Sequence, residues 1–273
     1  MARNLVVARV GENSLHRAWL QNAVPNFDMV LLFYGKNIPQ AWAEDGLETH
    51  HIPGSKWEGI TVFLEHTSNW RSYDRVFFPD DDLLFDAWSL NKFFDLSEQL
   101  GADLSQPALD CQSFYSHPIT LKSPSFIARF TNFVEIMCPC LSRRFLEVAK
   151  PLMAESKSGW GLDFYWPLLL ERLQMSPPVI IDEVAITHTR PVGSAGNGCD
   201  ANHSPMQDLK NLQQKYKFPI PARQVVAAIT GEQLLTMDEH KLPLKLKLIE
   251  DTFQIDNLKA GDKYYVISEI MAA

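Results

Sequence analysis

Three consecutive carboxylates, Asp80, Asp81 and Asp82, follow the apolar run at residues 73–78 and are the feature best suited to chemistry. Adjacent carboxylates repel one another, and a divalent cation such as Mn²⁺ or Mg²⁺ removes that penalty. On an extended segment, Asp80 and Asp82 point one way and Asp81 points the other. We therefore predict that Asp80 and Asp82 bind a metal and that Asp81 meets another group, such as a ribose hydroxyl. The alternative interpretation is a solvated acidic turn.

A second carboxylate, Asp163, precedes an apolar helical segment in the sequence Trp160-Gly161-Leu162-Asp163. A carboxylate in this place could act as a general base that removes a proton from an acceptor hydroxyl. Trp160 and Gly161 would then contact the acceptor, because glycine allows close approach and tryptophan offers an apolar face. The alternative interpretation is that Asp163 is only the N-cap of the helix.

His188 follows an apolar run at residues 184–186 and precedes the glycine-rich stretch 193–198. A neutral imidazole is a good metal ligand. We predict that His188 is a third metal ligand beside a mobile loop that closes over a nucleotide. An ordinary hydrogen-bonded histidine is the alternative.

Three residues are candidates for binding a nucleotide. Arg9 and Gly11 lie at the end of the first expected strand, where a base and ribose could sit, and Lys56 could pair with a phosphate. A solvated surface lysine is the alternative for Lys56. The sequence has neither GxGxxG nor GxxxxGK[ST], so it does not predict a Rossmann dinucleotide site or a phosphate loop.

The elements that must position these residues alternate along the chain. Strands are expected at 4–10, 27–33, 73–78 and 179–187, and helices at 14–22, 57–70, 86–100, 142–156, 164–174 and 204–216. This alternation predicts an α/β fold with an open, mostly parallel, Rossmann-like sheet flanked by helices. Ligands of such sheets bind beyond the carboxyl ends of the strands, where the acidic cluster lies. We expect a catalytic domain at residues 1–193 and a flexible loop with a mainly helical C-terminal extension at 194–273, which could belong to the same domain.

Bulk composition narrows the class of protein. The chain has 273 residues, is 46% hydrophobic and carries a formal net charge of -8. The charge disfavours a nucleic acid partner. We expect no signal segment and no transmembrane segment, and the cysteine pattern favours free thiols in a cytoplasmic protein. The oligomeric state stays open.

Four motifs together resemble one family. They are residues 73–82, 105–110, 160–164 and 181–188. In order and rough spacing they are similar to a family of uncharacterised proteins, abundant in plants and present in bacteria, which resembles glycosyltransferases of the GT-A fold. The resemblance covers about residues 5–193 and leaves the C-terminal part unexplained.

The resemblance implies a metal-dependent glycosyltransferase. The cluster Asp80–Asp82 would match the DxD motif that binds metal and nucleotide-sugar diphosphate, His188 a late metal ligand, and Asp163 the base of inverting members. The chain has Leu162 where many such enzymes carry Glu. The implied reaction moves a sugar from a nucleoside diphosphate sugar to a hydroxyl acceptor, such as a carbohydrate. The alternatives are a metal-dependent nucleotidyltransferase or phosphoryl hydrolase, and an inactive scaffold that binds a sugar or a protein.

Overall fold

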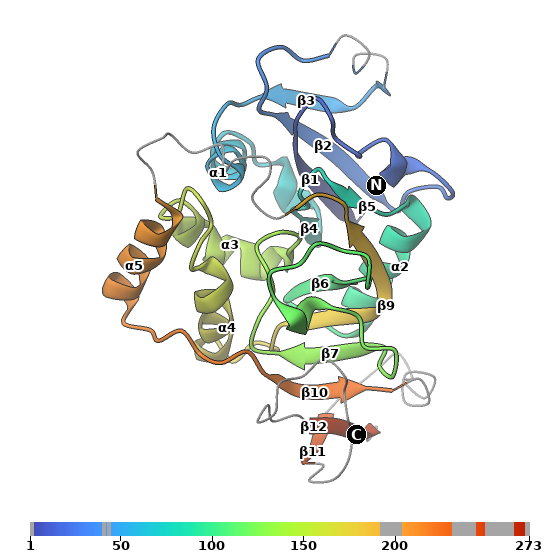
Figure 1. Ribbon diagram of the computed structural model, residues 1–273, viewed down its shortest axis with the longest axis vertical. Helices are drawn as coiled ribbons and strands as arrows, with labels where there is room; N and C mark the ends of the chain where they lie inside the picture. Colours follow the sequence, from blue (N-terminus) through green and yellow to red (C-terminus); the bar gives the residue numbers. More distant parts are fainter. Residues whose placement is uncertain are drawn as a thin grey trace.

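The structure is a computed structural model that describes residues 3–39, 42, 45–191 and 204–230, and the backbone of two further strands at 244–248 and 265–270. A mixed β-sheet runs through the molecule, with helices on both of its faces (Figure 1). The glycine-rich stretch predicted as a mobile loop, residues 193–198, lies outside the described residues.

The sheet has the strand order β11-β12-β10-β7-β9-β6-β8-β4-β1-β2-β3, and the short strand β5 pairs with β9 beside this path. The strands are β1 (Asn4–Val10), β2 (Phe27–Phe33), β3 (Glu48–His51), β4 (Arg75–Phe77), β5 (Leu83–Leu84), β6 (Leu104–Leu109), β7 (Ala128–Thr131), β8 (Cys140–Ser142), β9 (Val179–His188), β10 (Val225–Ile229), β11 (Leu244–Leu248) and β12 (Tyr265–Ile270). Strands β3, β2, β1 and β4 are parallel, and β6 is parallel to β9, while β8 and β7 run antiparallel to their neighbours.

Helices cover both faces of this sheet. They are α1 (Lys56–His66), α2 (Ala87–Gln99), α3 (Arg143–Met153), α4 (Leu162–Arg172) and α5 (Pro205–Tyr216), with 3₁₀ turns η1 (Ala18–Leu20), η3 (Asn69–Ser72) and η4 (Pro118–Thr120). Figure 1 shows α2 on one side of the strands and α1, α3 and α4 on the other, with α5 beyond α4. The expected α/β architecture is therefore confirmed.

Strand β1 shows why the sheet is covered twice. All seven of its residues are buried. Val6 and Ala8 pack into one hydrophobic cluster, and Leu5 and Val7 pack into another. Because successive side chains of a strand point to opposite faces, a strand that is apolar throughout needs cover on both.

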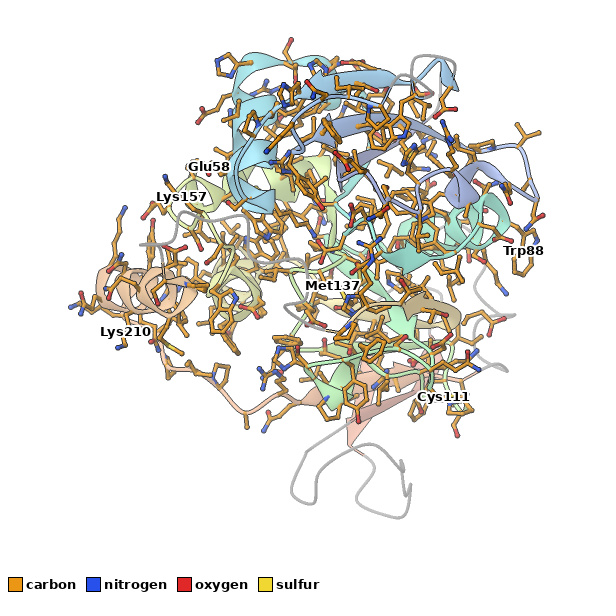
Figure 2. All side chains as sticks on the ribbon, turned by 45° about the horizontal axis from the view of Figure 1, so that its top comes forward. Glu58, Trp88, Cys111, Met137, Lys157 and Lys210 are labelled. Atoms are coloured by element: carbon orange, nitrogen blue, oxygen red, sulfur yellow. The ribbon has the colours of Figure 1, made fainter. Side chains whose placement is uncertain are left out.

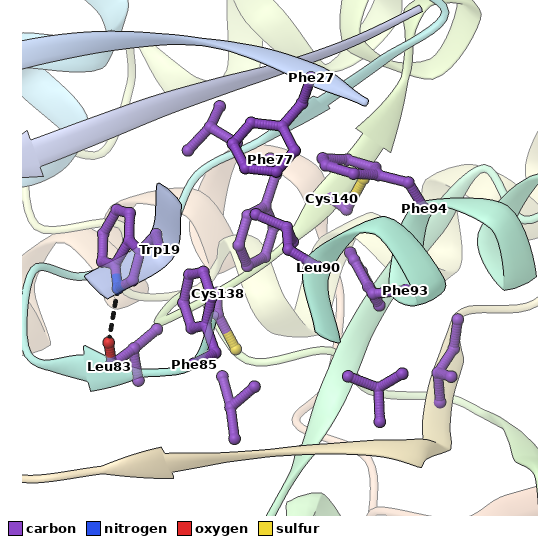
Figure 3. Packing of buried hydrophobic residues seen from close by; sticks show 14 of the residues in the cluster. Trp19, Phe27, Phe77, Leu83, Phe85, Leu90, Phe93, Phe94, Cys138 and Cys140 are labelled. Carbon is purple, nitrogen blue, oxygen red and sulfur yellow. Dashed lines mark hydrogen bonds between the residues drawn. The ribbon is translucent and has the colours of Figure 1, made fainter. Parts of the chain in front are cut away.

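The core on the α2 side holds the chain immediately after the acidic cluster. Trp19 donates from Nε1 to the Leu83 carbonyl at 2.8 Å, and its ring stacks on Phe85 at 4.7 Å (Figure 3). Phe77 of β4 packs against Phe85, Phe93 and other aromatic rings of this cluster. The residues before and after Asp80–Asp82 are therefore fixed by buried aromatic packing.

Two expected elements need correction. The helix expected at 14–22 is only the 3₁₀ turn η1, because Asn22 has a φ of 69° and Leu15 N is bonded to the Asp81 carbonyl at 2.8 Å. The C-terminal part is not mainly helical. It contains α5, but the described elements after it are β10, β11 and β12. Residues 225–229 read VVAAI, and this apolar run pairs antiparallel with β7.

Two smaller expectations can also be compared with the structure. Cys138 and Cys140 are buried free thiols, whereas Cys111 is exposed. Within the described residues, no helix is long and apolar enough to cross a membrane.

Candidate active site

A cavity of about 620 Å³ lies beyond the carboxyl ends of β1 and β4. This volume suits a small-molecule site, since such sites range over roughly 300–1,000 Å³. The cavity is lined by nine of the ten residues singled out from the sequence: Arg9, Lys56, Asp80, Asp81, Asp82, Trp160, Gly161, Asp163 and His188. The tenth, Gly11, lies directly behind Asp81 and donates its backbone N–H to Asp81 Oδ2 at 2.6 Å.

Asp80 continues the line of β4 beside β1. Its backbone forms a bridge with Arg9, and its N–H donates to the Met137 carbonyl at 3.0 Å. The side chain faces Lys56, whose Nζ lies 2.7 Å from Asp80 Oδ1 and also donates to the carbonyls of Ile136 and Met137. Burial raises the pKa of Asp80, although the Lys56 ammonium opposes this. Lys56 is therefore committed to Asp80 and two carbonyls.

Asp82 faces His188 because β5 and β9 are paired with Leu83 opposite His188. Asp82 Oδ2 lies 3.3 Å from His188 Nε2, and His188 Nδ1 bonds to the Phe114 carbonyl at 2.6 Å. Burial lowers the pKa of His188, but its bonds to Asp82 and Phe114 outweigh this and raise it overall. Asp82 Oδ1 is buried and has no hydrogen-bond partner among the described residues.

These two residues fit a divalent metal. With Nδ1–H donated to Phe114, a neutral His188 presents the lone pair of Nε2 toward the Asp82 carboxylate, and a cation satisfies both. Among the described residues, no group of three His, Cys, Asp or Glu side chains is arranged as a complete metal cluster. Mg²⁺ and its relatives typically take only one or two carboxylates from the protein and the remaining ligands from substrate phosphates and water.

Asp81 points to different partners from those of its two neighbours. Its Oδ2 accepts from Gly11 N and from the Tyr34 hydroxyl at 3.3 Å, and its Oδ1 lies 3.4 Å from Arg190 Nη1. Burial raises the pKa of Asp81, while Gly11 N–H and Arg190 lower it. Burial and Asp81 together raise the pKa of Tyr34 to about 12. Asp81 therefore ties the first strand and Arg190 to the cavity wall.

Arg9 is a bracing residue in this structure. It is 3% exposed, and its guanidinium donates to the carbonyls of Leu32, Gly54 and Ser55 at 3.0, 2.6 and 3.2 Å. Burial lowers its pKa to about 10. Its guanidinium lies 5.2 Å from the centre of the Tyr34 ring, which is 36% exposed. Arg9 thus holds the turn before α1 and supports an aromatic ring at the cavity wall.

Asp163 lies in the first turn of α4 and is 6% exposed. The interpretation of Asp163 as the N-cap is wrong, because that position belongs to Gly161, whose φ is 96°. Asp163 Oδ1 accepts from Phe164 N at 3.1 Å. Burial raises the pKa of Asp163 to about 7, against the opposing influence of Arg223. Trp160 beside it is 42% exposed and offers an apolar face.

The same architecture occurs in solved glycosyltransferases. A Staphylococcus aureus TarS fragment, residues 1–349 in complex with UDP-GlcNAc, superposes with a TM-score of 0.51 over 78% of this chain at 10% identity. The chain has a GT-A fold. It spans 65% of that TarS structure. Glucosyl-3-phosphoglycerate synthase from Mycobacterium tuberculosis, solved with Mn²⁺, UDP-glucose and phosphoglyceric acid, superposes with a TM-score of 0.48, 16% identity and coverage of 80% of this chain and 81% of that one. No family model matches the chain, and no curated protein matches its sequence.

One wall of the GT-A cavity depends on contacts around the N-terminus of α1. Glu58 of α1 forms an ion pair of 3.2 Å with Lys157 in the loop before α4 (Figure 2). Ser55 donates to the Lys157 carbonyl. Met137, which Figure 2 shows near the middle of the molecule, accepts from Lys56 on the same wall. These contacts set the distance between the acidic cluster and the loop that carries Trp160.

The GT-A cavity also contains residues that the sequence analysis missed. Glu135, between β7 and β8, is 9% exposed, and burial followed by the Asp163 charge raises its pKa to about 7. His117 and Arg223 line the same wall. Glu135 is a lone charge in the apolar run 133–138, which is a signal that could have been used. Arg223 lies in a proline-rich connection between α5 and β10, and nothing in the local sequence marks it.

Proposed function

We propose that this chain is a metal-dependent glycosyltransferase that moves a sugar from a nucleoside diphosphate sugar to a hydroxyl acceptor, with inversion at the anomeric carbon. The observation that carries the proposal is the presence, in one cavity of a GT-A fold, of the facing pair Asp82 and His188 and of the buried carboxyl Asp163. The first pair suits a metal and a diphosphate, and the second group suits a base.

The donor end of the proposed site is the wall formed by Tyr34, Arg190 and the acidic cluster. Tyr34 presents an aromatic ring for a nucleobase, and Arg190 adds positive charge beside Asp81. Asp82 and His188 would hold the metal, with Asp80 adding negative charge next to it. Arg9, Gly11 and Lys56 would act by holding this wall in place, since their polar groups bond to the protein itself. The TarS fragment that shares the fold holds UDP-GlcNAc, which makes a UDP-sugar the first donor to test.

The proposed reaction needs a proton acceptor and a stabilised leaving group. Asp163 takes the proton of the acceptor hydroxyl, whose oxygen forms a bond to the anomeric carbon while the bond from that carbon to the diphosphate oxygen breaks. When bound, the metal supplies positive charge that stabilises the diphosphate as it leaves. A carboxyl with a pKa of about 7 is a stronger base than an ordinary aspartate and is still ionised in part at neutral pH. Trp160 and Gly161 would contact the acceptor.

The proposal is tested by measuring thermal stabilisation with UDP, GDP, CDP and ADP and their sugars, each with and without Mn²⁺. We expect one nucleotide to stabilise the protein only when Mn²⁺ is present, and Asp82→Ala to remove this effect. Glu65→Gln, at an exposed carboxylate on α1, is the matched control and should keep it. Full stabilisation of Asp82→Ala would contradict the assignment of the metal site.

Product analysis separates glycosyl transfer from chemistry at phosphorus. Glycosyl transfer releases a nucleoside diphosphate, whereas a nucleotidyltransferase or phosphoryl hydrolase releases a nucleoside monophosphate or orthophosphate. We expect the diphosphate. A monophosphate that depends on Asp82 would retain the metal site and overturn the reaction proposed for it. Binding without turnover for any acceptor would favour the inactive scaffold.

A further inference from the structure

Three residues from distant parts of the chain meet on one wall of the cavity. His117 precedes η4, Glu135 lies between β7 and β8, and Arg223 lies between α5 and β10, and all three line the cavity together with Asp163 and Phe164. The proposed reaction assigns no role to any of the three.

Arg223 is held in place by apolar contacts. Its guanidinium lies 4.7 Å from the centre of the Phe133 ring and 5.2 Å from that of Phe164. Arg223 Nη2 lies 3.5 Å from His117 Nε2. Burial, reinforced by the Arg223 charge, lowers the pKa of His117 to about 4, so that a neutral imidazole accepts from Arg223. Arg223 Nε is buried and has no hydrogen-bond partner among the described residues.

Glu135 offers the complementary group. Its backbone N–H donates to Gln106 Oε1 at 2.6 Å, which fixes the residue, and its Oε1 lies 4.0 Å from His117 Nε2. Its Oε2 is buried and has no hydrogen-bond partner in the part of the chain that the structure describes. The next two residues, Ile136 and Met137, bond through their carbonyls to Lys56. Glu135 therefore lies between the Lys56–Asp80 pair and the residues around Asp163.

We infer that Glu135 and Arg223, supported by His117, form an acceptor subsite for a neutral sugar that presents adjacent hydroxyl groups. A buried acceptor and a buried donor without partners each cost free energy until a ligand satisfies them. Vicinal hydroxyls do this for both, because each hydroxyl can donate and accept. An anionic acceptor would meet the carboxyls of Glu135 and Asp163, and a cationic one would meet Arg223.

Apolar surface beside this polar pair suits the face of a sugar ring. Trp160 and Ile220 line the cavity and are 42% and 49% exposed, and Phe164 lies between Arg223 and Asp163 in the lining. A pyranose that rests on such a surface can point its hydroxyls at Glu135 and Arg223 while another hydroxyl faces Asp163. Ile220 and Arg223 both follow α5, so the segment after α5 contributes directly to the subsite.

This inference rests on the proposed function, and a binding experiment can separate the two. The probes are methyl β-D-glucopyranoside, methyl β-D-galactopyranoside and methyl α-D-mannopyranoside, with glycerol 3-phosphate as the anionic comparison. Saturation-transfer NMR measures binding of each probe to the full chain in the presence of UDP and Mn²⁺. Thermal stabilisation by UDP and Mn²⁺ is measured separately on the same samples.

We expect at least one glycoside to bind, and Glu135→Gln and Arg223→Gln each to weaken it by about tenfold or more, with Arg223→Lys recovering part of the loss. Arg71→Gln, on the surface turn η3 outside the cavity, is the matched control and should bind like the wild type. Nucleotide stabilisation should be unchanged in every variant, which also shows that each is folded.

Two results would overturn the inference. One is that no glycoside binds, whatever the nucleotide does. The other is that glycerol 3-phosphate binds through Arg223 while the glycosides do not, which would make the acceptor anionic. Glycoside binding that depends on Glu135 without any nucleotide effect would support the subsite and count against the donor site instead.

Discussion

His188 Nε2 lies 3.3 Å from Asp82 Oδ2, and the two atoms are brought together by the pairing of β5 with β9. The pairing sets Leu83, the residue after Asp82, directly opposite His188. A short strand of two residues therefore joins a carboxylate and an imidazole that are distant in sequence. Because His188 Nδ1 is already bonded to Phe114, only Nε2 remains to meet a ligand.

His188→Ala should weaken the metal-dependent binding of a nucleotide. Loss of one of two protein ligands removes a fixed electron pair, and we expect the apparent affinity for Mn²⁺ in the presence of the nucleoside diphosphate to fall by about 10- to 100-fold or more. Isothermal titration with Mn²⁺ at fixed nucleotide measures this. His66→Ala, at an exposed histidine in the last turn of α1, is the matched control. Equal Mn²⁺ affinity in the two variants would contradict the role of His188.

Asp163→Asn should abolish turnover and leave donor binding intact. General-base catalysis typically contributes 10²- to 10⁴-fold, and we expect kcat to fall by about that factor. For the wild type, kcat/KM should rise with pH through about 7, because the carboxyl must lose its proton to act as a base. Release of the nucleoside diphosphate as a function of pH measures both effects. A variant that keeps the wild-type pH profile would exclude Asp163 as the base.

Glu135→Gln should stabilise the protein at high pH. Burial, then the Asp163 charge, raises the pKa of Glu135 from 4.5 to about 7 in the folded state. A carboxyl whose pKa is raised on folding contributes stability below its unfolded pKa and loses that contribution as the pH rises through its folded pKa. Replacing it with a neutral amide removes this loss, which falls between about pH 4.5 and pH 7 and above.

Urea unfolding at pH 4.5 and pH 8 measures the effect. Relative to the wild type, the free energy of unfolding of Glu135→Gln should be greater at pH 8 than at pH 4.5 by on the order of 2 kcal/mol, because each unit of pKa shift corresponds to about 1.4 kcal/mol. Glu65→Gln, at an exposed position on α1, should show the same difference from the wild type at both pH values. A pH-independent effect of Glu135→Gln would show that the carboxyl is ionised throughout.

The sequence predicts the buried parts of this fold well. Strands β1 and β2 occur at the expected residues 4–10 and 27–33, because uninterrupted apolar runs between polar or glycine-containing segments suit strands covered on both faces. The N-cap Asp86, whose side chain accepts from Ser89 N at 2.8 Å, was equally visible. In contrast, β3 has the sequence ETHH and lies at the edge of the sheet, so no hydrophobic pattern marks it.

The candidate site was predictable where its residues follow regular elements. Asp80–Asp82 and His188 come after strands, and such positions meet at one edge of a sheet. Arg223 and His117 were not predictable, because their meeting depends on where two irregular connections cross the cavity. The committed contacts of Lys56 were hidden for the same reason, since its two carbonyl partners, Ile136 and Met137, are about eighty residues away. The assigned roles of all these residues stay predictions.

Gly159→Ala should destabilise the protein and disturb the cavity wall. Gly159 has a φ of 80°, and a Cβ added there would lie 2.1 Å from Cδ1 of the buried Trp57. Gly101→Ala is the matched control, because Gly101 has a φ of 57° but nothing within 4 Å of an added Cβ. The control should lose about 1 kcal/mol from backbone strain alone. The Gly159 variant should lose that and on the order of 2 kcal/mol more, since Trp57 must move. Urea unfolding measures both, and because Trp57 lines the cavity, nucleotide binding should weaken only in Gly159→Ala. Equal losses in the two variants would show that Trp57 yields freely and does not fix this wall.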